Sequence, residues 1–434
     1  MNWLELYPDR LQTPEQAVAG IKSGERLFLS GNCSVPQRVL AALTARAPEL
    51  NDVEIVQVLT IGSADYVAPE LAGHLRVNTL FISDNVRQAV NEGRADFTPC
   101  FLSEIPGLFK SGRLPLDVAL IQVSPPDEHG FCSFGVEVGI SKPAAQAARL
   151  VIAEVNPWMP RTLGDSFIHV SKLDAIVPVD YLLPEVCLTN GETAAEHIAA
   201  HVAELIPDGA TLQTGIGAIP DAVLHQLTSH RHLGIHTELF SDGVIDLVER
   251  GVITGEHKTL HPGKIVAGFL LGTQHLYNFA HDNPVVELHP TDYVNDPFII
   301  AQNERMVAIN SAIEVDLTGQ VCADSIGPRL YSGVGGQVDF MYGAARSKGG
   351  VPIIALPSTL KKKNAPDVSR IVPMLKPGAG VVTTRNHVHY IVTENGVADL
   401  YGKTIAQRAQ AMIAVAAPEF RCELTREAKA LNYL

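Results

Sequence analysis

Hydrophobic and polar positions follow the same course in two stretches of the chain. The first begins at Thr13 (TPEQAVAGIKSGERLFLSGNCSVPQRVLAAL) and the second at Thr193 (TAAEHIAAHVAELIPDGATLQTGIGAIPDAVLHQL). Each predicts a helix with apolar residues at helical spacing, a glycine turn, a short buried strand and a second helix opened by a proline. Gly31 and Gly215, which follow the two strands, are 184 residues apart. The chain therefore reads as a duplication of βα units.

Further short apolar runs have the length of buried strands, and helical periodicity lies between them, for instance at 141–149 and 404–416. The runs are 53–58, 118–123, 150–154, 175–178, 264–270, 352–356 and 389–393. We predict an α/β protein of two similar open α/β domains, residues 1–185 and 186–434, joined near the prolines around Leu182–Val186. The glycine loops would line a cleft between the domains, which we expect to hold the active site.

Composition narrows the class of protein. The chain has 434 residues, is 46% hydrophobic and 18% charged, and carries a formal charge of −14. This charge argues against a nucleic-acid groove, because phosphate backbones need a basic face. No run of about 18 apolar residues could span a bilayer, and the N-terminus lacks the apolar core of a signal peptide. We therefore expect a cytoplasmic protein without membrane partners.

The six cysteines are scattered, and neither they nor the 16 histidines form a metal-binding pattern. We expect reduced thiols, no metal and no redox cofactor. One basic triplet, Lys361 to Lys363, is either a solvated loop or an anchor for a phosphorylated ligand, and the residues alone leave both open.

The stretch from Thr211 to Val244 carries the candidate chemistry. A strand runs into the GIGAIP loop, and a second strand, in GIHTELFSDGV, ends on Glu238. Glycines let a ligand approach backbone amides, and helix N-termini direct such amides at anions. A single carboxylate beside these donors suits covalent catalysis, with Glu238 as nucleophile. The alternative is a strand–turn–helix with a structural acid that caps the following turn.

A third glycine loop, SGVGGQ, follows NSAIEVDLTGQVCADSIG (310–327). Gly333, Gly335 and Gly336 let this loop approach a ligand closely, although a bulge or tight corner would use glycine similarly. Asp339 is expected to bond to the backbone of its own turn.

Taken together, these segments resemble the acetyl-CoA hydrolase/transferase family of class I CoA-transferases, most closely its 4-hydroxybutyrate CoA-transferase branch. The resemblance extends over nearly the whole chain. Beyond the loops above, it rests on EVNPWMPRTLGDSFIHVS (154–171), HTELFSDG, SRIVP (369–373), VVTTRNHVHYIVTENGVADLYGK (381–403) and PEFR (418–421). Residues 386–389 and 394–396 depart from the family, where an acidic and an aromatic residue are expected.

The resemblance implies roles for particular residues. Glu238 would become a glutamyl-CoA thioester, with the Gly336 amide and Asn310 as oxyanion donors. The CoA-binding residues would be Gly215, Ile216, Gly217, Ala218, Ile219, Ser332, Gly335, Gly336 and Lys361.

Four further residues are candidates for the acid substrate. Gln213 either donates to an acyl or carboxylate oxygen or is a satisfied buried amide. Gly31 and Asn32 form the first-half turn equivalent to 215–217, and His129 lies in the loop PPDEHGFCSFG. Nothing in the sequence lowers the pKa of Cys33, so we do not expect it to be a nucleophile.

By this resemblance we expect a transferase that moves coenzyme A, its co-substrate, from an acyl-CoA to a short-chain carboxylate such as 4-hydroxybutyrate or acetate. An acyl-CoA hydrolase with the same glutamate and a non-catalytic metabolite-binding protein remain alternatives. Duplicated α/β enzymes of this size often form a homodimer or homotetramer, and we expect one of these.

Overall fold

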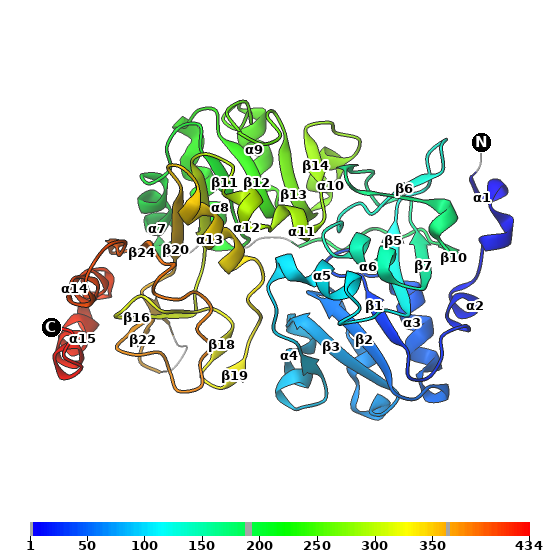
Figure 1. The fold of residues 1–434 in the computed structure, drawn as a ribbon, viewed down its shortest axis with the longest axis horizontal. Helices are drawn as coiled ribbons and strands as arrows, with labels where there is room; N and C mark the ends of the chain where they lie inside the picture. The colour runs from blue at the N-terminus through cyan, green and yellow to red at the C-terminus, as the bar shows by residue number, and fades with distance from the viewer. Residues whose placement is uncertain (1–2, 187–192, 362–364) are drawn as a thin grey trace. The chain divides into compact units, whose positions relative to one another are not determined.

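The computed structural model describes residues 3–186, 193–361 and 365–434. The chain forms two compact units (Figure 1). The first comprises residues 1–187 and 266–294, and the second residues 188–265 and 295–434. The first unit thus takes in a segment, 266–294, that the sequence analysis places in the second domain.

A seven-stranded sheet forms the centre of the first unit, and all its pairings are parallel. In spatial order its strands are β10 (Ala175–Pro178), β7 (Leu150–Val155), β5 (Val118–Val123), β1 (Arg26–Leu29), β2 (Val53–Val58), β3 (Leu75–Phe81) and β4 (Asp96–Phe97). Five of these strands, β10, β7, β5, β1 and β2, were predicted from short apolar runs, which are typical of buried parallel strands. Strands β3 and β4 were not predicted. Leu27, Leu29, Ile55, Val118 and Ile152 belong to one buried cluster.

The helices of the first unit are short. They are α1 (Trp3–Leu6), α2 (Pro14–Val18), α3 (Gln37–Arg46), α4 (Asp84–Asn91), α5 (Ile105–Lys110), α6 (Ser141–Ala147), α10 (Gln274–Ala280) and α11 (Thr291–Val294). The remaining strands of this unit are β6 (Phe131–Ser133), β8 (Leu163–Gly164), β9 (Phe167–His169), β14 (Val286–Leu288) and β13 (Ile265–Leu270) from Val266 onward.

Six strands of the second unit lie side by side in one sheet, and five of them repeat the order of the first sheet; the sixth, at the edge, pairs antiparallel to its neighbour. In spatial order they are β25 (Gly396–Asp399), β24 (Tyr390–Thr393), β20 (Val351–Ala355), β15 (Met306–Asn310), β11 (Thr211–Gln213) and β12 (Gly234–Phe240). Strand β11 lies between β15 and β12, as β1 lies between β5 and β2, and these pairings are parallel. The predicted duplication of α/β units is confirmed; the cleft between them stays a prediction.

Seven helices that the structure describes belong to the second unit, and their lengths range from four to 13 residues. They are α7 (Thr193–Ala203), α8 (Ala218–Gln226), α9 (Gly243–Glu249), α12 (Pro297–Ile300), α13 (Gln337–Arg346), α14 (Ile405–Val415) and α15 (Pro418–Ala430). Helix α8 begins two residues before Pro220, so this proline lies in the first turn, where it costs no hydrogen bond.

Very short strands fill the segment between β15 and β24. They are β16 (Glu314–Asp316), β17 (Val321–Cys322), β18 (Ser325–Ile326), β19 (Arg329–Leu330), β21 (Thr359–Leu360), β22 (Val368–Ser369) and β23 (Ile371–Val372). Among the helices that the structure describes, none is long and apolar enough to cross a membrane.

Candidate active site

Glu238 lies on β12, two residues before the strand ends at Phe240, rather than at the strand end that the sequence predicts. The strand is buried along its length except at Glu238, which is partly exposed. The adjacent strand β11 ends at Gln213, and β15, the next strand beyond it, ends at Asn310. We call this set of strand ends the carboxyl edge of the second sheet; ligands of parallel α/β sheets commonly bind at such an edge.

Two donors hold the Glu238 carboxylate. The Asn295 side chain donates from Nδ2 to Glu238 Oε2 at 2.9 Å, and the backbone amide of Gly336 also bonds to the carboxylate. Asn295 is fully buried. The contact with Gly336 requires glycine, because a Cβ there would lie 2.0 Å from Oε2 and 2.3 Å from Asn295 Nδ2. The structure thus places Gly336 against Glu238, and the role of its amide as an oxyanion donor stays a prediction.

The environment of Glu238 sets its protonation. Burial raises the pKa of this carboxyl group to about 7, while the bonds from Asn295 and Gly336 act in the opposite direction because they stabilise the anion. A carboxyl group with a pKa near neutrality is ionised in a substantial fraction of molecules at physiological pH. It is also less solvated than a surface carboxylate, which favours nucleophilic attack.

Asn295 was missed by the sequence analysis. It precedes Asp296, which caps α12 by accepting a hydrogen bond from the Phe298 amide at 2.7 Å, and Pro297 opens that helix. The run Asn-Asp-Pro is typical of a turn that starts a helix, and this explanation accounts for all three residues. Only the fold brings Asn295 to Glu238, 57 residues earlier in the chain.

Asn310 bonds to another residue. Its Nδ2 donates to Gln213 Oε1 at 3.0 Å, across neighbouring strands of the carboxyl edge. The structure thus joins two candidates from the sequence analysis, but it places Asn295 rather than Asn310 on the Glu238 carboxylate.

The two glycine loops of the second unit have the conformations that their glycines permit. Gly217 has a φ of 114° and Gly335 a φ of 58°, both in the left-handed region. No side chain caps α8, which begins at Ala218, and Ile216 in the preceding loop is exposed. These features suit a ligand-binding loop, and contacts of Gly215 to Ile219 with CoA stay a prediction.

Two other residues that were predicted to bind CoA, Ser332 and Lys361, lie outside the GIGAIP loop. The Ser332 hydroxyl donates to the Ala323 carbonyl oxygen at 3.2 Å, within its own loop. Lys361 is exposed, while Lys362 and Lys363 lie outside the described residues. The choice between a solvated loop and a phosphate anchor therefore remains open.

The first-unit candidates have structural constraints of their own. A Cβ at Gly31 would lie 2.0 Å from the Val58 carbonyl oxygen, so the turn needs glycine. Asn32 has a φ of 51° and a buried Oδ1 that has no hydrogen-bond partner among the described residues. Their predicted part in binding the acid is neither supported nor opposed by these contacts.

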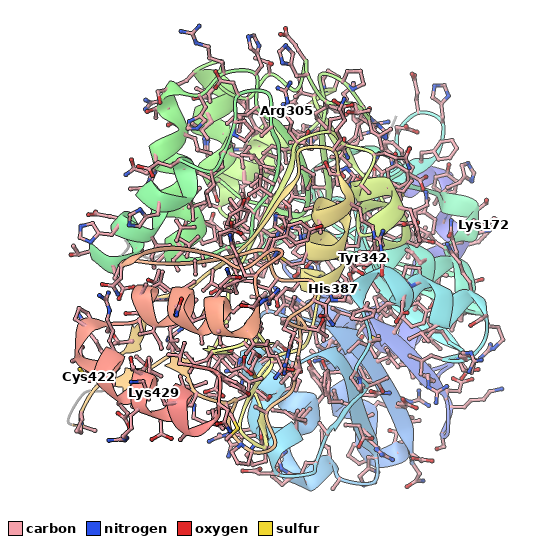
Figure 2. All side chains as sticks on the ribbon, turned by 60° about the vertical axis from the view of Figure 1, so that its left-hand side comes forward. Lys172, Arg305, Tyr342, His387, Cys422 and Lys429 are labelled. Carbon is pink, nitrogen blue, oxygen red and sulfur yellow. The ribbon has the colours of Figure 1, made fainter. Side chains whose placement is uncertain are left out.

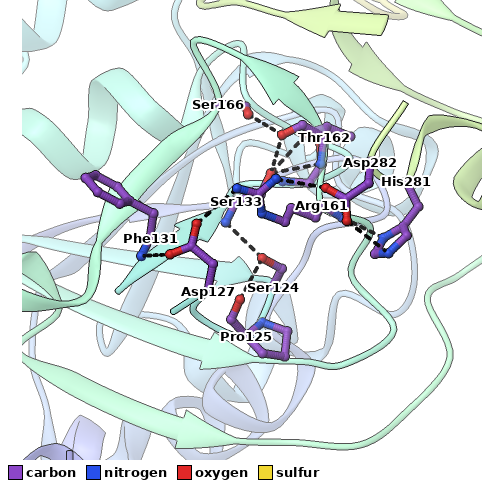
Figure 3. A network of polar contacts seen from close by, with 11 residues as sticks. Ser124, Pro125, Asp127, Phe131, Ser133, Arg161, Thr162, Ser166, His281 and Asp282 are labelled. Atoms are coloured by element: carbon purple, nitrogen blue, oxygen red, sulfur yellow. Dashed lines mark hydrogen bonds and ion pairs between the residues drawn. The ribbon is translucent and has the colours of Figure 1, made fainter. Parts of the chain in front are cut away.

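His129 is exposed, in a loop held by hydrogen bonds to Asp127. Figure 3 shows Asp127 with Phe131 and Arg161. Asp127 Oδ1 accepts from the His129 and Phe131 amides, both at 2.9 Å, and its Oδ2 lies 3.0 Å from Arg161. Burial opposes ionisation of Asp127, but these donors outweigh it and lower its pKa. The hydrogen bonds and ion pair of Asp127 give this loop a structural role. A role of His129 in binding the acid stays a prediction.

The two departures from the family motif lie away from the carboxylate contacts. The His387 ring packs edge-on against Tyr342 of α13 at 5.4 Å, and Figure 2 shows both side chains. Asn395 donates to Ser358 Oγ at 3.1 Å. Neither residue contacts Glu238, Asn295 or Gly336 through a hydrogen bond that the structure records.

A partly buried carboxylate that accepts hydrogen bonds from Asn295 and Gly336, on the carboxyl edge of a duplicated α/β fold, is the arrangement expected of a CoA-transferase. Family models agree: residues 1–184 match the acetyl-CoA hydrolase/transferase N-terminal domain and residues 272–428 the C-terminal domain. The chain belongs to the acetyl-CoA hydrolase/transferase family, as its sequence motifs predict.

Known relatives are similar over their full length. A protein named 4-hydroxybutyrate coenzyme A transferase from Clostridium kluyveri is 52% identical over 429 residues, which cover 99% of each chain. A solved 4-hydroxybutyrate CoA-transferase from Porphyromonas gingivalis is 42% identical, with a TM-score of 0.85 over 99% of this chain and all of that one. RipA from Yersinia pestis is 37% identical, with a TM-score of 0.92 over the whole of both chains.

Proposed function

We propose that the chain is an acyl-CoA:carboxylate CoA-transferase that moves CoA between short-chain acids through a glutamyl-CoA thioester on Glu238. The hydrogen bond from Asn295 to Glu238 Oε2, beside the Gly336 amide, carries this proposal. It makes the two carboxylate oxygens different, as the reaction requires. The named relatives that are CoA-transferases of 4-hydroxybutyrate and of butyrate with acetate support the same substrate class.

The first step assigns Oε1 as the nucleophile. Oε1 of ionised Glu238 attacks the thioester carbonyl of the acyl-CoA, the C–S bond breaks, and CoA leaves as a thiolate. An acyl-glutamyl anhydride remains, joined through Oε1. Splitting the reaction in this way replaces attack by a weakly nucleophilic free acid with attack by a positioned carboxylate.

The second step uses the oxygen that the protein holds. The thiolate attacks the glutamyl carbonyl carbon, and negative charge develops on Oε2, where Asn295 donates beside the Gly336 amide. The C–Oε1 bond then breaks, so the first acid leaves as a carboxylate that carries Oε1, and the enzyme keeps CoA as a thioester. A second acid reverses both steps. Loss of one oxyanion donor typically lowers the rate by about 10²–10³.

Intact mass measurement after incubation with acetyl-CoA, without acceptor acid, tests the proposal. We expect an adduct of the mass of CoA that borohydride treatment and peptide mapping place on Glu238. Glu238→Gln should form no adduct. Glu238→Asp should lose activity by orders of magnitude while keeping its fold, because the carboxylate is withdrawn by one methylene. Glu249→Gln, which removes an exposed carboxylate on α9, is the matched control and should behave as wild type.

Two results would contradict the proposal. Substantial activity in Glu238→Asp would exclude the nucleophile assignment. Steady loss of acetyl-CoA that is independent of any acid would show a hydrolase, in which water intercepts the same intermediate.

A further inference from the structure

Gln213, Asn310 and Glu238 lie on one face of the second sheet. Gln213 of β11 pairs with Ala308 of β15, and Asn310 is two residues further along, on the same side of that strand. Leu212 pairs with Ile235 of β12, so Gln213 is level with His236, and Glu238 follows on the same side.

Helix α13 covers this face near the site. It begins directly after Gly336, and its Phe340 ring lies 6.2 Å from the ring of His236. The carboxylate, its Gly336 donor and the Gln213–Asn310 pair therefore share the surface between α13 and the carboxyl edge of the second sheet.

The bond between Asn310 and Gln213 fixes which way the glutamine amide faces. Asn310 Nδ2 donates to Gln213 Oε1 at 3.0 Å, so Gln213 Nε2 is directed away from Asn310. Gln213 is 5% exposed, yet no acceptor for Nε2 occurs among the described residues. The side chain is held in place while its amide N–H₂ has no protein acceptor, so this group is available to donate to a ligand oxygen.

The proposed reaction needs such a donor. Asn295 engages Oε2 of Glu238, which serves the oxyanion on the glutamyl carbon. Attack by Oε1 creates a second oxyanion, on the acyl carbon of the substrate, and this oxygen belongs to the carboxylate when the acid is free. Gln213 is on the strand beside Glu238 and on the same face of the sheet.

We propose that Gln213 Nε2 binds the carboxylate or acyl oxygen of the acid substrate, and that Asn310 is a positioning residue that holds the Gln213 amide in this orientation. This inference rests on the proposed function for the identity of the ligand. It gives Asn310 a different role from the oxyanion donor that family resemblance implies.

Acetate binding tests the inference without turnover. Binding of [¹³C]acetate is measured by NMR in a Glu238→Ala background, which cannot react and does not repel the ligand. Gln213→Met removes the donor with little change of shape and should weaken binding by about 10- to 100-fold, as expected for a hydrogen bond to a charged group. Asn310→Leu should weaken binding less, because the Gln213 amide then rotates between two orientations.

The double variant separates positioning from direct contact. If Asn310 acts through Gln213, Gln213→Met with Asn310→Leu binds acetate as Gln213→Met alone does. Additive losses would show that Asn310 contacts the ligand itself and would overturn the positioning role. Binding within twofold of the background in Gln213→Met, or no acetate binding by the background protein, would overturn the donor role.

Two controls complete the design. Gln226→Met changes an exposed glutamine on α8 and should leave binding unchanged, and thermal unfolding checks the fold of each variant. The CoA adduct is measured separately on the wild-type protein. If the adduct fails to form while acetate binding still depends on Gln213, the proposed transferase is wrong and the carboxylate-binding role of Gln213 stands.

Discussion

At the scale of single residues, the contact between Gly336 and Glu238 leaves no room for a larger residue than glycine. A side chain at Gly336 has no space, since its Cβ would overlap both Oε2 and the Asn295 amide. Gly336→Ala should therefore displace the nucleophile or the helix start, and lower kcat/KM by at least about 10²-fold. Steady-state kinetics check this, with Gly20→Ala, where a Cβ meets nothing within 4 Å, as the control. Near wild-type activity in Gly336→Ala would show that the site tolerates a Cβ here and would contradict the close approach of Gly336 to Glu238.

The raised pKa of Glu238 predicts how the activity depends on pH. The nucleophile must be ionised, and burial raises its pKa to about 7, so activity should rise with pH through that value. Asn295 stabilises the ionised form, and its removal should raise the pKa further. In Asn295→Leu the rising limb of the kcat/KM profile should therefore move to higher pH, with a lower plateau. A limb that moves to lower pH would show that Asn295 does not donate to the carboxylate.

At the scale of elements, the start of α3 depends on two residues distant in sequence. Pro36 offers no side-chain cap. Instead Glu154 Oε1 accepts from the Val39 amide at 2.7 Å, and the Tyr181 hydroxyl accepts from the Gln37 amide at 3.2 Å and donates to Glu154. A buried carboxylate thus takes the place of an N-cap.

Tyr181→Phe should lower the free energy of unfolding by about 1–3 kcal/mol, because it leaves buried groups unpaired. Burial raises the pKa of Glu154 to about 7, above its value of 4.5 in an unfolded chain. The stability linked to this group is present below pH 4.5 and is lost as pH rises to about 7. Glu154→Gln should therefore flatten the decline of stability across this range. Urea unfolding at several pH values measures both effects, with the exposed Glu49→Gln as control.

Strands that are long, continuous apolar runs could be predicted from the sequence. The runs at 53–58 and 118–123 are β2 and β5 without a change of bounds, because buried parallel strands are continuously apolar. The two- and three-residue strands between Glu314 and Val372 are too short to show a period. Glu238 and the Gly336 loop could be found from motifs, whereas Asn295 reads as a helix start and reaches the site only through folding.

At the scale of the whole molecule, the duplication relates five successive strands of the first sheet to five of the second. Strand β1 corresponds to β11, and β2 to β12, with Leu27 paired to Ile55 and Thr211 to Gly234. The oligomeric state stays a prediction, for which sedimentation equilibrium is the measurement. Two further expectations also stay predictions: that the active site lies in a cleft between the domains, and that Gly31 and Asn32 help to bind the acid.

The two halves have diverged at the position of the nucleophile. Counting from the paired residues Ile55 and Gly234, the first-half counterpart of Glu238 is Leu59, which has a φ of 38°. A duplicated ancestor would have begun with equivalent copies, and here only one has a carboxylate at that position. Active-site titration with acetyl-CoA should therefore saturate at one CoA per chain, so that its stoichiometry counts polypeptides in any assembly. A value of two would reveal a second, unrelated acceptor in the first half.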